Sequence, residues 1–205
     1  MEEALRRQLA AAVGTSGLGA DDVVHPANLT QLKEVLAACT AASAVVAPRS
    51  SSPTDVANAV VIDGDNLNSI LVDPTGLLLR AGAAATWAAV REAANAHRLS
   101  VSGLPTLRSD RVGESVALGE IAHRTLVGVD LLTHGGELIT AGGRTLKDVV
   151  GYDLAGLVLG GGQRLGLVLA VTLRLDPAGS GVPAQPGLGR WRGDEVVDVS
   201  TAFTR

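Results

Sequence analysis

Apolar residues recur at intervals of three and four positions in several stretches of the chain, which is the pattern of amphipathic helices. The clearest stretch begins after Asn28, a residue type that caps helices, with Gln31 in the position of a capping-box partner. Leu32, Leu36 and Cys39 follow at helical spacing, so Cys39 is expected to pack inside. Helices are predicted over residues 2–13, 28–39 and 86–97, with a short one over residues 153–159.

Short apolar runs between turn residues predict the strands. The stretch 73–76 (Asp-Pro-Thr-Gly) is a strong turn signal between two such runs, and the Gly-Gly pair at 135–136 marks a second hairpin. Strands are predicted over residues 23–24, 44–47, 59–62, 69–72, 77–81, 126–133, 137–141 and 165–175. Because hairpins and isolated helices prevail over regular strand–helix–strand units, the pattern predicts an α+β fold.

The amino-acid composition disfavours several classes of binding partner. Aromatic residues make up only 2% of the 205 residues, so the core must be aliphatic, and a base-stacking surface is disfavoured. The formal net charge of −4 argues against nucleic acid or an anionic membrane as a partner. The single cysteine excludes an internal disulfide, and no apolar stretch has the length of a membrane span or the pattern of a signal peptide. We therefore expect a cytoplasmic protein without membrane insertion.

Three local patterns suggest chemistry, and each has a plainer interpretation. The glycine-rich run 160–166 leads into a strand instead of opening a helix, so it is no Rossmann fingerprint and is more simply a turn. Residues 113–117 (Gly-Glu-Ser-Val-Ala) resemble a nucleophile elbow around Ser115. No buried strand precedes them, which leaves a hydrolase as a remote alternative. The histidines are scattered without metal-ligand spacing, so no metal site is predicted.

The segment 142–154 (Gly-Gly-Arg-Thr-Leu-Lys-Asp-Val-Val-Gly-Tyr-Asp-Leu), together with residues 160–175, resembles the end of the FAD-binding domain in FAD-linked oxidases of the vanillyl-alcohol-oxidase type. It is most similar to the FAD-binding subunits of bacterial glycolate oxidase. The resemblance implies a PCMH-type FAD-binding domain of two α+β lobes, without the substrate or cap domain. The implied parts are an N-terminal helix and linker (1–19), a domain (20–176) with lobes of about 20–82 and 83–176, and a Pro/Gly linker and tail (177–205).

The resemblance also implies where FAD is held. The family's pyrophosphate loop follows the strand that ends near residue 48, and serines replace its glycines here. The family's flavin-side stretch falls on residues 111–115, where Glu114 replaces a glycine. No histidine or cysteine matches the family's site of covalent attachment, so FAD is expected to be non-covalent. The residues expected to bind it are Pro48, Arg49, Ser50, Ser51, Ser52, Gly113, Ser115, Lys147, Gly151, Tyr152, Asp153, Gly160, Gly166 and Leu167.

Two functions follow from the resemblance. The first is an FAD-binding subunit of a glycolate-oxidase-like complex that oxidises a 2-hydroxy acid, with a larger flavoprotein subunit and an iron–sulfur subunit as partners. No catalytic residue is predicted, because a partner or a further domain would supply it. The second is a degenerate, FAD-free member that acts as a scaffold or regulatory subunit. The serines at 50–52 and Glu114 favour this alternative.

Overall fold

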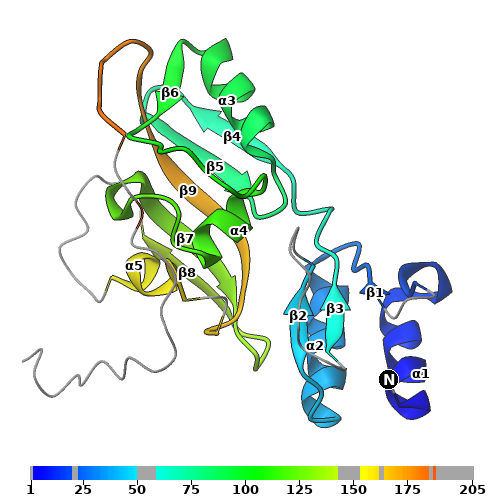
Figure 1. Ribbon diagram of the computed structural model, residues 1–205. Helices are drawn as coiled ribbons and strands as arrows, with labels where there is room; N and C mark the ends of the chain where they lie inside the picture. Colours follow the sequence, from blue (N-terminus) through cyan, green and yellow to red (C-terminus); the bar gives the residue numbers. More distant parts are fainter. Residues whose placement is uncertain are drawn as a thin grey trace, which may run out of the picture.

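The computed structural model describes residues 2–19, 23–49, 59–142, 153–161, 164–184 and 187. These residues form two lobes that lie side by side, the smaller one N-terminal and the larger one built on a long twisted sheet (Figure 1). None of the described helices is long and apolar enough to cross a membrane.

The smaller lobe contains a parallel sheet and two helices. Its strands are β1 (Val23–Val24), β3 (Val60–Ile62) and β2 (Val46–Pro48), in that spatial order, and its helices are α1 (Glu3–Val13) and α2 (Leu29–Ala41), with the short η1 (Thr15–Gly17). Asn28 caps α2 as predicted, because its Oδ1 accepts a hydrogen bond from the Gln31 N–H at 3.0 Å. The Gln31 side chain accepts in turn from the Ala27 N–H at 2.7 Å. The buried residues Leu9, Val35 and Cys39 belong to the core of this lobe.

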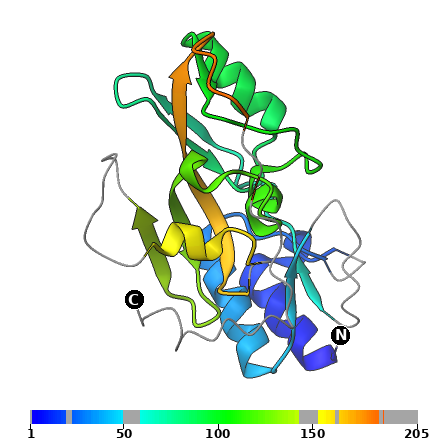
Figure 2. The same cartoon turned by 60° about the vertical axis from the view of Figure 1, so that its left-hand side comes forward.

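The larger lobe is an antiparallel sheet with helices on one face (Figure 2). Its strands are β4 (Ile70–Asp73), β5 (Leu78–Gly82), β6 (Leu99–Val101), β7 (Leu126–Leu132), β8 (Leu138–Gly142) and β9 (Leu167–Pro177), and its helices are α3 (Trp87–Ala96), α4 (Val112–Ala117), η2 (His123–Thr125) and α5 (Leu154–Val158). The spatial order is β4-β5-β9-β7-β8, and β6 pairs with the far end of β9. Because side chains alternate along a strand, Leu79 and Ala81 pack in the helix-covered core, whereas Arg80 and Gly82 face the opposite side.

Strand β9 contributes to both cores. Its residues Val171, Leu173 and Leu175 lie in the core of the larger lobe. Leu167 and Leu169, at its beginning, pack in the core of the smaller lobe. Leu132 of β7 joins these two residues there, so the two lobes do not have separate interiors.

The α+β class and the arrangement in two lobes are confirmed, but the division into lobes differs from the predicted one. The predicted first lobe included residues 70–82, whereas β4 and β5 join the larger sheet because β5 pairs along its length with β9. The predicted N-terminal helix lies outside the predicted domain, yet α1 is part of the smaller lobe. Its residues Leu5, Leu9 and Val13 are buried in the core of that lobe.

Candidate functional site

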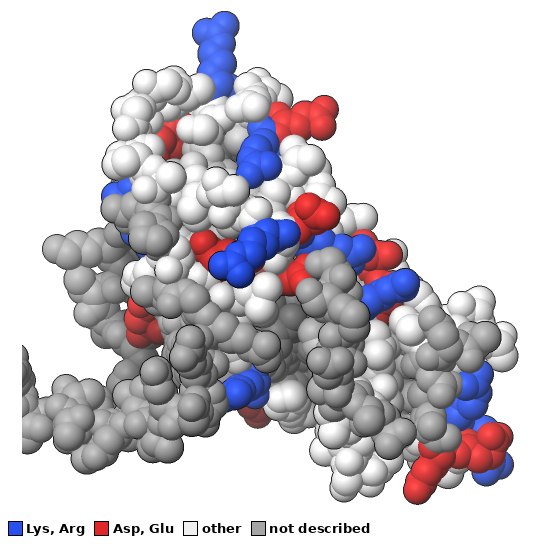
Figure 3. Space-filling model, in the orientation of Figure 1, with Lys and Arg blue, Asp and Glu red and all other residues white. Residues whose placement is uncertain are grey.

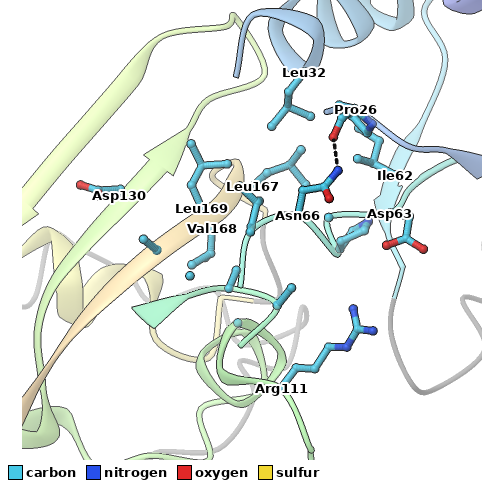
Figure 4. A pocket seen from close by; sticks show the side chains of 18 of the residues that line it. Pro26, Leu32, Ile62, Asp63, Asn66, Arg111, Asp130, Leu167, Val168 and Leu169 are labelled. Atoms are coloured by element: carbon cyan, nitrogen blue, oxygen red, sulfur yellow. Dashed lines mark hydrogen bonds between the residues drawn. The ribbon is translucent and has the colours of Figure 1, made fainter. Parts of the chain in front are cut away.

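A cavity of about 630 Å³ lies where the two lobes meet. The smaller lobe lines it with residues that follow its strands and begin α2, and the larger lobe lines it with the uncovered face of its sheet and the start of α4. Figure 4 shows Asp63 and Arg111 toward one end, Asp130 toward the other, and Leu167 to Leu169 between them. The volume lies within the range of small-molecule and cofactor sites, which is about 300–1,000 Å³.

A charged cluster stands at the carboxyl ends of the parallel strands. His25, Arg49 and Asp63 directly follow β1, β2 and β3, respectively. Arg49 Nη1 donates to Asp63 Oδ2 at 2.6 Å, and His25 Nδ1 lies 3.6 Å from the same oxygen. Burial of the Asp63 carboxyl by itself raises its pKa. The Arg49 hydrogen bond and charge, with the Asp65 N–H, outweigh burial, so the pKa lies below its ordinary value.

Arg111 connects the lobes at the same end of the cavity. Its Nη1 lies 2.6 Å from Asp65 Oδ1, in the turn after β3. The backbone next to Arg111 is fixed by the segment before α3, because Gly113 N donates to Ala83 O at 2.8 Å. A Cβ atom at Gly113 would lie 2.7 Å from the Ala83 Cβ, so this approach of the two segments requires glycine. Only small residues therefore face the cavity at this contact.

The sheet forms the opposite wall. Arg80 of β5 and Asp130 of β7 form an ion pair on the uncovered face of the sheet. Leu167, Val168 and Leu169 of β9 add an apolar surface between this pair and the lobe junction (Figure 4). The site thus has charged groups toward both ends and an apolar middle.

Positive and negative side chains are balanced around the cavity. Among the described residues, three arginines and three carboxylates line it: Arg49, Arg80, Arg111, Asp63, Glu114 and Asp130. Figure 3 shows the same interleaving of basic and acidic side chains on the face of the molecule in view. An anionic ligand would meet guanidinium groups that are already held by carboxylates.

Four of the residues expected to bind the cofactor line the cavity, namely Pro48, Arg49, Gly113 and Leu167. Six others, Ser50, Ser51, Ser52, Lys147, Gly151 and Tyr152, lie outside the described residues.

Ser115 does not face the cavity, contrary to the prediction. It is fully buried within α4, where its Oγ accepts from Trp87 Nε1 at 2.8 Å and donates to Glu120 Oε2 at 3.0 Å. The Ser109 N–H donates to the same Glu120 oxygen at 3.2 Å. The resemblance of residues 111–115 placed Ser115 beside the flavin, but α4 turns this residue into the core. Burial at this position also removes the basis for the hydrolase alternative.

The three remaining candidates serve the local structure around α5 and β9. Asp153 is exposed, forms an ion pair with His123 and caps α5 by accepting from the Gly156 N–H at 2.9 Å. Burial acts to raise its pKa, but the Gly156 N–H and the His123 hydrogen bond and charge lower it below the ordinary value. The Gly160 N–H donates to Val116 O at 2.8 Å.

Gly166 has a backbone role as well. Its φ is +148°, and a Cβ there would collide with the Leu132 carbonyl oxygen of β7. Glycine at this position lets the chain enter β9 beside β7.

Sequence reasoning missed several lining residues, above all Asp63, Arg80 and Asp130. Asp63 directly follows the predicted strand at 59–62, and a charged residue immediately after a buried parallel strand is a usable signal. Arg80 and Asp130 lie fifty positions apart and become neighbours only when β9 inserts between their strands.

The described lining fits FAD. Arg49 and Arg111 can supply charge-assisted hydrogen bonds to a pyrophosphate, which is the strongest recognition that this ligand offers. The small residues at Gly113 and Ala83 and the apolar side chains of β9 suit ring systems and their riboses.

Comparisons with known proteins agree with this geometry. A sequence profile described as an FAD binding domain matches residues 20–147, more than half of the chain. D-lactate dehydrogenase from Archaeoglobus fulgidus is 25% identical over 170 residues, which are 76% of this chain and 38% of that protein.

Solved structures share the fold. The 4-ethylphenol oxidase from Gulosibacter chungangensis superposes with a TM-score of 0.72 at 12% identity, covering 85% of this chain and 42% of that one. A variant of BBE-like 1 from Physcomitrella patens gives 0.65 at 17% identity, covering 83% and 44%. The chain thus spans about two fifths of the length of these relatives. The chain belongs to the FAD binding domain family of the FAD-linked oxidases, whose cofactor is FAD.

Proposed function

We propose that the chain binds FAD non-covalently in the cavity between its lobes and is the FAD-binding part of a cytoplasmic 2-hydroxy-acid oxidoreductase. The observation that carries the proposal is the cavity itself, with Arg49 at the carboxyl end of a parallel strand and Arg111 at the same end of the cavity. The similarity to a protein named D-lactate dehydrogenase supports a 2-hydroxy acid as the substrate class.

The residues of the chain would bind and orient the cofactor. Arg49 and Arg111 would hold the pyrophosphate, and the segments at Ala83 and Gly113 would present backbone and methyl groups to a planar ring. The β9 residues would cover the apolar parts of the cofactor. FAD, when bound, supplies the capacity to accept a hydride, and the protein contributes position and electrostatics.

Groups that bind the substrate carboxylate and remove its proton would come from outside the described chain. In the glycolate-oxidase-like arrangement that we propose, a larger flavoprotein subunit provides them, and an iron–sulfur subunit accepts the electrons. Affinity purification of the chain from its native cells tests this proposal. We expect both subunits together with dye reduction by glycolate or D-lactate. A preparation that contains neither subunit and reduces no dye would contradict it.

Cofactor binding can be tested on the purified chain. FAD at about 100 times its Kd should stabilise the protein by about 2.7 kcal/mol. That corresponds to a rise in Tm of about 5–10 °C for a chain of this size. Acid precipitation should release all of the flavin into the supernatant if attachment is non-covalent. FMN, which lacks the adenylate half and the pyrophosphate, is the matched control and should stabilise the chain less. A colourless protein whose Tm does not respond to FAD would favour the FAD-free scaffold instead.

A further inference from the structure

Asp63 is the one charged residue among the described residues that is buried, with 2% of its surface exposed. Three backbone and side-chain contacts fix it at the wall of the cavity. Its N–H donates to Val24 O at 2.8 Å, its Oδ1 accepts from the Asp65 N–H at 2.9 Å, and its Oδ2 accepts from Arg49 at 2.6 Å. The carboxylate therefore has a single position, set by the ends of two parallel strands.

Arg49 has the opposite character. Its backbone is fixed, because its N–H donates to Ile62 O at 2.8 Å, but 52% of its side chain is exposed. A half-exposed arginine ordinarily samples many rotamers and loses that freedom when it binds a ligand. The bond to the immobile Asp63 selects one of these rotamers in advance, at the rim of the cavity.

A carboxylate is unexpected in the wall of a cavity that binds an anionic ligand. Taken alone, it repels an anionic ligand, and a buried charge is unfavourable unless it is well paired. Both effects are offset if the carboxylate fixes a cation that the ligand uses, because an arginine has five N–H donors and can bind two acceptors at once.

We propose that Asp63 is a positioning residue for the pyrophosphate of the cofactor: it holds the Arg49 guanidinium in the orientation that meets the phosphate oxygens. This inference rests on the proposed function, because it requires FAD in this cavity. It assigns to Asp63 an effect on affinity whose sign is opposite to that of simple charge repulsion.

The test is calorimetric titration of the full chain with FAD and with ADP, which carries the same diphosphate. Asp63→Asn should lower the affinity for both ligands about tenfold, although it removes a negative charge from the site. Arg49→Lys should lower both affinities similarly, because an ammonium group keeps the positive charge but lacks the planar guanidinium, whose N–H donors can bind a carboxylate and a phosphate at once. In an Arg49→Gln background, Asp63→Asn should cause no further loss of affinity for either ligand.

Asp130→Asn is the matched control, since Asp130 also lines the cavity and pairs with an arginine other than Arg49. If repulsion alone governs affinity, Asp63→Asn and Asp130→Asn will both tighten ADP binding, which would overturn the proposal. Unchanged affinity in Asp63→Asn or in Arg49→Lys would also overturn it. If Asp63→Asn fails to fold, unchanged ligand affinity in Arg49→Lys, at a half-exposed residue, still overturns the proposal. A parent chain that binds neither ligand would refute the proposed function as well, which distinguishes the two failures.

Discussion

Replacing Ser115 by alanine tests the buried hydrogen-bond chain that links α3, α4 and the segment after α4. The substitution leaves Trp87 Nε1 without its acceptor and removes the donor that Ser115 gives to Glu120. Trp87 is 3% exposed, so water cannot replace the lost partner. A buried polar group without a partner costs about 1–3 kcal/mol. We expect Ser115→Ala to lower the free energy of unfolding by about 2 kcal/mol and Tm by about 4–8 °C.

The assay is denaturant unfolding followed by tryptophan fluorescence. The chain contains two tryptophans, so a Trp191→Phe background makes the signal specific to Trp87. Ser180→Ala, at an exposed serine, is the control and should change stability by less than about 0.5 kcal/mol. If Ser115→Ala unfolds at the same denaturant concentration as its parent, Ser115 does not link these elements and our account of its burial is wrong.

Three further outcomes are expected. Because the pKa values of Asp63 and Asp153 are lowered in the folded state, their contribution to stability is complete above the unfolded pKa of about 3.9. That contribution should disappear as the pH falls through the lower pKa values of the folded state. A Tm that does not change with pH over this acidic range would contradict the prediction. Cys39, whose pKa burial raises to about 11, should react with iodoacetamide only after unfolding, and rapid labelling of the native protein would refute its burial. Gly166→Ala should destabilise the fold by at least about 1–3 kcal/mol, measured by thermal unfolding, because the new Cβ meets the Leu132 carbonyl. A neutral result would show that β9 does not start against β7 in this way.

Local features of the fold could be predicted because their causes are local. Asn28 caps α2 through a neighbour three residues away, and the turn at 73–76 closes a hairpin whose Asp73 side chain accepts from the Gly76 N–H. The order of strands could not be predicted from pattern alone. Leu79 pairs with Leu173 across more than ninety positions, and an apolar run carries no information about its partner.

The part of the site at the end of β2 could be predicted from the sequence. Pro48 and Arg49 were found because the resemblance places a loop after that strand, and both line the cavity. Ser115 was misplaced, because a five-residue motif does not reveal which side of a short helix faces the core. Arg80 and Asp130 were missed, since only the completed sheet brings them together.

The position of β9 has a consequence for how the protein is made. Among the described strands, β9 at the centre of the larger sheet is the last to be synthesised, so β5 and β7 have no central neighbour until residue 177 has left the ribosome. Pairing over such sequence separations is slow, and unpaired strand edges are prone to association with other chains. Premature termination before β9 would also remove Leu167 and Leu169 from the core of the smaller lobe. A nascent chain therefore acquires neither lobe in full until β9 has been made, and the cavity, which β9 lines, cannot form before then.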